Sequence, residues 1–96
     1  MRASALQAII RTRAIDSKKL IFTKHVSARM KERGITLTCI IEILTKGSIH
    51  RGPEPNLIKG SIECRMEYYC VGHNIGVVVA LSDDDPNLIV VTAMHI

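Results

Sequence analysis

The residues best suited to chemistry gather in one short stretch of the chain, from His25 to Arg33. In a helix of 3.6 residues per turn, His25, Arg29 and Glu32 fall on one face within about 60° of one another. Guanidinium groups bind phosphate in a bidentate manner, and an imidazole beside them can exchange a proton near neutral pH. This stripe predicts catalytic roles for His25, Arg29 and Glu32 in RNA cleavage. Lys31 and Arg33, on its flanks, are predicted to contact nucleic acid.

The same stripe also has a purely structural interpretation. Arg29 and Arg33 can form surface ion pairs with Glu32, and His25 can cap the start of the helix. The residues alone leave both interpretations open.

A second group of polar residues follows one predicted strand, Ser61 to Cys70. Because side chains alternate along a strand, Arg65, Glu67 and Tyr69 share its solvated face. They can bind phosphate, take a proton and stack a base, respectively. We therefore take Glu67 as a candidate catalytic residue and Arg65 and Tyr69 as candidate nucleic-acid contacts. An ordinary polar sheet face explains the three residues as well.

Histidines outside the stripe add further candidates. His50 and Arg51 precede a Pro-rich segment, where they can lie at the entrance of a cleft and contact nucleic acid. Exposure in a solvated loop explains these residues too. His95 is a candidate acid or base, with packing on an edge strand as its alternative, whereas His73 in a turn needs no function. Alternation along the last strand places His95 on the same side as Ile89, Val91 and Ala93. The histidines have no short mutual spacing, so we predict no metal site.

Hydrophobic periodicity predicts helices in the first half of the chain. The first covers Ala3 to Ala14, and the second runs from its cap at Thr23 to Arg33, where Gly34 closes it. The third is capped by Thr36 and ends at Lys46, with Gly47 suited to a left-handed cap.

The second half of the chain is predicted to form strands. A short weak strand over 48–51 precedes a loop over 52–56, whose prolines exclude regular pairing. Longer strands follow over 61–70, 75–81 and 88–96, separated by turns at 72–74 and 82–87. This order predicts an α+β fold in which two or three N-terminal helices pack on one face of a four-stranded antiparallel sheet.

Composition and charge favour one domain, over residues 1–96, with an anionic partner. Of the 96 residues, 47% are hydrophobic and 23% charged, which suits one hydrophobic core. The net charge of +4 makes nucleic acid the first candidate partner, with solubility as the other explanation. Only one Phe and two Tyr are present, which argues against a base-stacking sheet of the single-strand-binding kind. Lys and Arg end at Arg65, so the anion-binding face is expected in the first two-thirds of the chain.

The cysteines favour a reducing compartment. There are three, without CxxC spacing, which argues against a disulfide framework and a structural zinc site. Cys64 and Cys70 are about 20 Å apart in an extended strand, too far to bridge, so we expect free thiols. No apolar run approaches the length of a membrane span. We expect a cytoplasmic protein with no cofactor and no membrane association.

The helical stripe also carries a family resemblance. His25-x-x-x-Arg29-Met30-x-Glu32-Arg33-Gly34-Ile35, then a helix ending at Gly47 and strands ending in Ile89-Val90-Val91-Thr92, resembles a small bacterial domain family of unknown function related to BrnT and RelE toxins. The resemblance covers 22–93. It implies helices before a twisted antiparallel sheet, and RNA cleavage by residues on that sheet. The chain departs from RelE proteins in lacking a Lys/Arg-rich C-terminal end, which argues against ribosome-dependent cleavage.

Three classes of function remain open on the sequence. The first is a metal-independent endoribonuclease, acting as the toxin of a toxin–antitoxin system and restrained by a cognate antitoxin. The second is a non-catalytic nucleic-acid-binding or immunity-like module that uses its basic residues only for phosphate contacts. The third is a small structural partner within a larger complex, with charges that serve solubility alone. The sequence leaves the oligomeric state open, with a homodimer as one candidate.

Overall fold

Three α-helices form where the periodicity of the sequence predicts them. The computed structural model describes residues 3–56, 60–70, 72–82 and 85–96, in which the helices are α1 (Ala3–Ala14), α2 (Lys24–Arg33) and α3 (Leu37–Lys46). The Thr23 and Thr36 hydroxyls accept hydrogen bonds from the first turns of α2 and α3, as N-caps do. Gly34 ends α2 in the left-handed conformation, at φ 67°. A short 3-10 helix, η1 (Ser17–Lys19), follows α1.

The sheet has five strands and is mixed, which corrects the prediction of four antiparallel strands. Its strands are β1 (Leu20–Phe22), β2 (Ser48–Asn56), β3 (Ser61–Cys70), β4 (His73–Ser82) and β5 (Asp85–His95), in the order β1-β5-β4-β3-β2. β2 to β5 pair antiparallel, as predicted, whereas β1 pairs parallel with β5. β1 has only three residues, too few to show a period of two, so the sequence gives no sign of it.

β2 is longer than predicted, because the prolines do not interrupt it. Glu54, Pro55 and Asn56 still pair with β3, after two shifts of register. β2 is an edge strand, so a missing proline N–H on its outer side breaks no ladder. At Gly52, φ is 93°, and a Cβ there would lie 2.8 Å from the Glu63 carbonyl oxygen. Glycine at this position lets the shifted strand approach β3.

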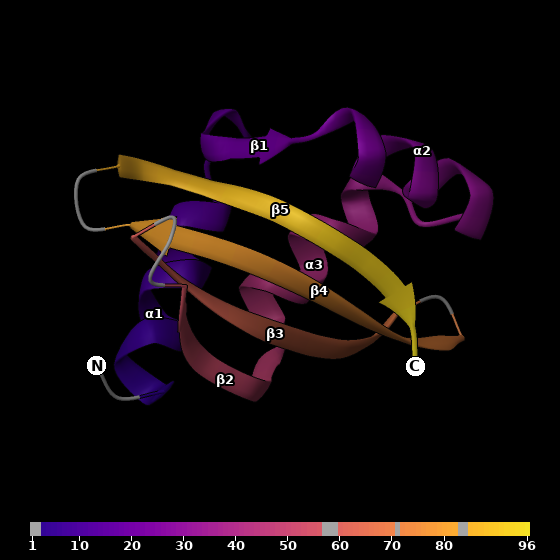
Figure 1. Cartoon of the computed structure of the whole chain (residues 1–96). Helices are drawn as coiled ribbons and strands as arrows, with labels where there is room; N and C mark the ends of the chain where they lie inside the picture. The colour runs from indigo at the N-terminus through magenta and orange to yellow at the C-terminus, as the bar shows by residue number, and fades with distance from the viewer. Residues whose placement is uncertain (1–2, 57–59, 71, 83–84) are drawn as a thin grey trace.

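The helices cover one face of the sheet and leave the other open. α1 and α3 pack against the strands and each other, whereas α2 packs on β5, on the β1 side of the sheet (Figure 1). The core between the layers is apolar, and its largest fully buried side chains are Leu6, Ile10, Ile40, Ile43, Leu44, Met66, Leu88, Val26, Val77, Val79 and Val90. The α+β class and the single-sided helical layer are therefore as predicted.

Two local predictions need correction or fall outside the described residues. Gly47 does not adopt the left-handed cap, since its backbone is extended, with φ −75° and ψ −178°. Of the turn predicted over 82–87, Asp83 and Asp84 lie outside the described residues, and β5 already begins at Asp85. None of the helices in the described ranges is long and apolar enough to cross a membrane.

Candidate active site

A carboxylate and a guanidinium meet on the open face of the sheet. Cys64 and Met66 of β3 point into the core. Because side chains alternate along a strand, the neighbouring Arg65 and Glu67 point to the opposite face, away from the helices. Arg65 Nε lies 2.8 Å from Glu67 Oε2. This buried N–H has no well-aligned hydrogen bond to any described group, so the contact is an ion pair alone. The Glu67 side chain is 16% exposed and that of Arg65 is 25% exposed. Both are therefore largely packed against the protein, yet a substrate can still contact them.

An imidazole completes this group from the neighbouring strand. His50 Nδ1 lies 3.5 Å from Glu67 Oε1, and His50 Nε2 lies 3.2 Å from the Ser48 hydroxyl. Ser48 pairs directly with Glu67 across the β2–β3 ladder, which brings the start of β2 beside the carboxylate. The His50 ring is 52% exposed and can meet a substrate. We call Arg65, Glu67 and His50 the open-face cluster.

The first helix and one glycine support the cluster from behind. The Arg11 guanidinium donates two hydrogen bonds, of 3.2 and 2.7 Å, to the Gly47 carbonyl, and Gln7 Oε1 accepts one of 2.9 Å from Ile49 N–H. These bonds fix the start of β2 on either side of Ser48. On β4, Gly76 pairs with Glu67, and a Cβ there would lie 3.3 Å from Arg65 Cδ. The sequence gives no signal for these supporting roles, because each depends on a contact between distant segments.

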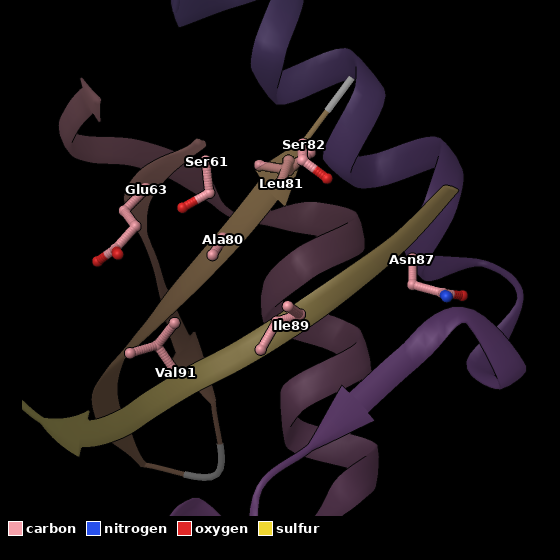
Figure 2. Close-up of a pocket in the computed structure, with 8 residues that line it drawn as sticks. All are labelled: Ser61, Glu63, Ala80, Leu81, Ser82, Asn87, Ile89 and Val91. Atoms are coloured by element: carbon pink, nitrogen blue, oxygen red, sulfur yellow. The ribbon is translucent and has the colours of Figure 1, made fainter. Parts of the chain in front are cut away.

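Two shallow hollows extend the open face beyond the cluster. One, of about 160 Å³, is lined by Arg51 and Arg65 and reaches Glu63. The other, of about 130 Å³, begins at Glu63 and has an apolar wall that includes Ile89 and Val91 (Figure 2). They share Glu63, so together they run across β2 to β5. Tyr69, 64% exposed at the other end of β3, points to the same face.

The predicted stripe on α2 does not meet the open-face cluster. His25 is exposed near the start of α2, and Arg29 forms an ion pair with Glu32 at 3.0 Å, with side chains 43% and 60% exposed. Lys31 is exposed on the same helix. α2 packs on β5, two places from β3 in the strand order, so the stripe and the cluster occupy different parts of the surface.

His95 joins the end of α2 on the helical side of the sheet. Its Nε2 lies 2.7 Å from the Arg33 carbonyl oxygen, and Arg33 Nη1 donates a 2.6 Å bond to the Ala93 carbonyl. The register shifts between Val78 and Val79, where one extra β5 residue, Val91, interrupts strict alternation. Ala93 is therefore buried, whereas Val91 lines the open face. This corrects the expectation that His95 shares a face with Ile89 and Val91.

Apart from the stripe on α2, the candidates thus divide into two groups on opposite sides of the sheet. The open face carries Glu67, Arg65 and Tyr69 with His50 and Arg51, and the other side carries His95 with Arg33. Among the described residues, no three His, Cys, Asp or Glu side chains converge as a metal site would require.

Comparison with known proteins assigns the chain to a family. Residues 22–95 match the model of a family described as a domain of unknown function, DUF4258. The chain belongs to this family. The match includes the open-face cluster and leaves α1, with its supporting Arg11 and Gln7, outside the DUF4258 domain. No curated protein and no solved structure matches the chain.

Proposed function

We propose that this DUF4258 protein binds single-stranded RNA across the open face of its sheet and cleaves the RNA backbone by acid–base catalysis. The observation that carries the proposal is the Glu67 carboxylate, which lies between the Arg65 guanidinium at 2.8 Å and the His50 imidazole at 3.5 Å. A base, an acid and a phosphate-binding cation are the groups that such cleavage needs.

Each member of the cluster has a defined role in the proposed reaction. Glu67 takes the proton from a ribose 2′-hydroxyl, whose oxygen then attacks the adjacent phosphorus. His50, in its protonated form, gives a proton to the departing 5′-oxygen. Arg65 orients Glu67 and stabilises the charge that develops on the phosphate oxygens. The products are a 2′,3′-cyclic phosphate and a free 5′-hydroxyl, and the reaction needs no metal ion or other cofactor.

The surroundings of the cluster suit a single strand of RNA. Arg51 and Arg65 line one hollow, where they can contact successive phosphates. The apolar wall formed by Ile89 and Val91 can receive a base, and the exposed Tyr69 ring can stack another. A strand that crosses the sheet in this way places a scissile phosphate beside Glu67.

We propose that this activity belongs to a toxin related to BrnT and RelE, restrained in the cytoplasm by an antitoxin. Support comes from α1, α2 and α3, which precede the antiparallel strands β2 to β5, with the candidate site on those strands. An endoribonuclease free in the cell is harmful, so a partner protein that covers the open face is the expected means of control.

The products of RNA digestion test the reaction directly. A labelled single-stranded RNA incubated with the protein in excess EDTA should yield fragments that end in a 2′,3′-cyclic phosphate. A single 2′-deoxy substitution should block cleavage at that position, because it removes the attacking hydroxyl. Mass spectrometry of the fragments identifies both results. Binding without cleavage would contradict the enzyme and favour a non-catalytic nucleic-acid-binding module.

The salt dependence of binding tests the phosphate contacts. The affinity for a 2′-O-methyl RNA should fall steeply with salt, and Arg51→Gln should reduce the slope of log K against log salt by about 0.7, since one phosphate contact is lost. Lys18→Gln, which removes the same charge from the exposed η1, should leave that slope unchanged. Equal slopes for the two variants, measured by fluorescence anisotropy, would remove Arg51 from the interface.

A further inference from the structure

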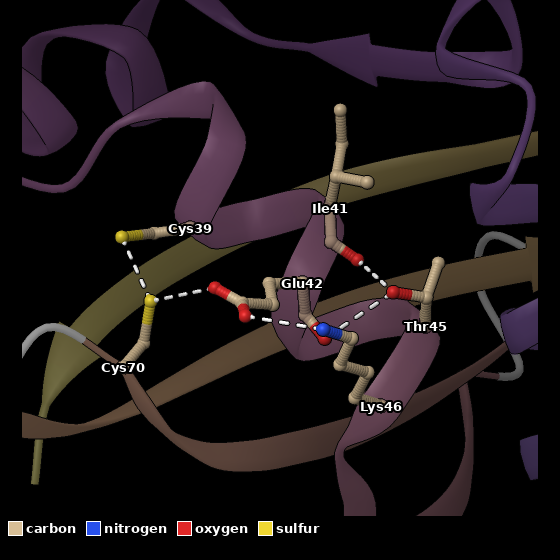
Figure 3. Close-up of polar contacts among 6 residues, drawn as sticks. All are labelled: Cys39, Ile41, Glu42, Thr45, Lys46 and Cys70. Atoms are coloured by element: carbon tan, nitrogen blue, oxygen red, sulfur yellow. Dashed lines mark hydrogen bonds and ion pairs between the residues drawn. The ribbon is translucent and has the colours of Figure 1, made fainter.

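Two cysteines meet in a groove on the helical side of the sheet, away from the open-face cluster. The groove has a volume of about 320 Å³, and its lining includes Cys39, Cys70, Arg33, His73 and His95. Cys39 is the third residue of α3 and Cys70 the last residue of β3. Their sulfur atoms lie 3.0 Å apart, and Figure 3 shows the two side chains pointing toward each other. The expectation of free thiols considered Cys64 with Cys70 and missed this pair, although all three cysteines are free thiols in the structure.

The two thiols of the pair differ in acidity. The hydrogen bond from the Cys70 thiol, followed by that from the Thr36 hydroxyl, lowers the pKa of Cys39 below its ordinary value of 9.0. Cys39 also lies in the first turn of α3, where the helix dipole favours an anion. The same bond to Cys39, together with burial, raises the pKa of Cys70 to about 12. Cys39 is therefore suited to attack, and Cys70 to hold its proton until a later step.

A carboxylate beside Cys70 can accept that proton. Glu42 Oε2 lies 3.3 Å from Cys70 Sγ, while Glu42 Oε1 pairs with Lys46 Nζ, also at 3.3 Å (Figure 3). The single S–H of Cys70 can point to Cys39 or to Glu42 at one time. A turn of this S–H toward Glu42 directs the proton away from Cys39.

We propose that Cys39 and Cys70 form a redox-active dithiol site that reduces small disulfides bearing acidic groups. The Cys39 thiolate attacks one substrate sulfur, the substrate S–S bond breaks, and the first thiolate leaves with the bonding electrons. Cys70 then gives its proton to Glu42 and attacks the Cys39 sulfur, which releases the second thiolate. Both released thiolates take up the protons that the protein thiols lose. One substrate disulfide is reduced to two thiols, and the protein dithiol is oxidised to a disulfide.

The charge of the groove determines the class of disulfide. Arg33 contributes a permanent positive charge to the lining, beside the rings of His73 and His95, which are in edge contact at 5.1 Å between centroids. The described lining contains no acidic side chain, and the Glu42 carboxylate beside Cys70 is paired with Lys46. Carboxylate groups on the substrate are therefore favoured over ammonium groups.

Oxidation by glutathione disulfide tests the site in the full-length protein. The reduced protein should lose two of its three thiols and two hydrogen masses, and peptide mapping should join Cys39 to Cys70. Cystamine, a cationic disulfide, should react about tenfold more slowly at low salt. A disulfide that involves Cys64, or no intramolecular disulfide, would overturn the site, and an equal or faster reaction with cystamine would overturn the substrate class.

Cysteine variants identify the attacking thiol. Cys70→Ser should stop at a glutathione adduct on Cys39, whereas Cys39→Ser should form no disulfide. Cys64→Ser is the matched control and should oxidise like the wild type. All three cysteines are buried, but Cys64 does not line this groove, and burial raises the pKa of its thiol to about 11. In the unmodified protein, iodoacetamide should label Cys39 at least about tenfold faster than Cys64 at pH 7. Equal labelling of the two would contradict the assignment of Cys39 as the nucleophile.

Discussion

Glu67→Gln should reduce RNA cleavage at least about 100-fold, because the amide cannot take the proton of the 2′-hydroxyl. The substitution keeps the size and shape of the side chain and its place beside Arg65 and His50. The affinity for a 2′-O-methyl RNA should therefore stay within a few-fold of the wild type, which separates a loss of chemistry from a loss of binding. The rate under single-turnover conditions measures the effect. Expression of the wild type without a partner should arrest growth, and expression of this variant should not.

A carboxylate on α2 supplies the control. Glu32→Gln makes the same change of charge away from the open face, on a side chain that is 60% exposed, and should cleave RNA within a few-fold of the wild type. Circular dichroism and the thermal midpoint should match the wild type for both variants. An active Glu67→Gln protein would contradict the proposed base. If His25→Ala were then inactive and folded, the site would move to the stripe on α2.

Gly47→Ala should lower the free energy of unfolding by about 3 kcal/mol, because no space exists for the added methyl group. A Cβ at this position would overlap the Ile43 carbonyl oxygen and would lie 2.7 Å from the Glu67 carbonyl oxygen. Both obstacles are backbone atoms, so the end of α3 and β3 would have to move apart. For a domain of this size the loss corresponds to a fall of roughly 12–24 °C in Tm. Chemical and thermal denaturation followed by circular dichroism measure it.

Gly34→Ala is the control that distinguishes the steric effect of an added methyl group from the effect of backbone conformation. Gly34 has a φ of 67° with nothing within 4 Å of an added Cβ, so alanine there meets only the conformational cost of about 1 kcal/mol. Gly47 has a negative φ, so alanine there meets only the steric cost. Equal destabilisation by the two substitutions would show that β3 does not press against Gly47. His50 would then lack the close strand pairing that brings it to Glu67.

The helices and the main strands could be predicted because their signals are local. Thr23, Gly34 and Thr36 mark helix ends through their own side chains and backbone preferences, and the alternation over 61–70 fixes which face carries Arg65 and Glu67. Two features could not be predicted: the strand at 20–22 and the continuation of β2 through its prolines. Both depend on pairing with segments distant in the sequence, which no local sequence pattern indicates.

The grouping of site residues was harder to predict, for the same reason. His50 was expected in or near a loop, and only the register of β2 on β3 brings it within 3.5 Å of Glu67. Val91 is an extra residue in β5 that interrupts the alternation of side chains, so His95 lies on the other side of the sheet. Cys39 and Cys70 are 31 positions apart, and the packing of α3 on β3 alone brings their sulfurs together.

The location of bound RNA on the folded protein tests the central claim most directly. A 2′-O-methyl RNA trinucleotide cannot be cleaved at a ribose hydroxyl, so it can be titrated against the isotope-labelled protein while backbone amide shifts are followed by NMR. Our account predicts that the largest shift changes lie on β2 and β3, around His50, Arg51, Arg65 and Glu67. Changes centred on His25 and Arg29 of α2, or none at millimolar RNA, would contradict it.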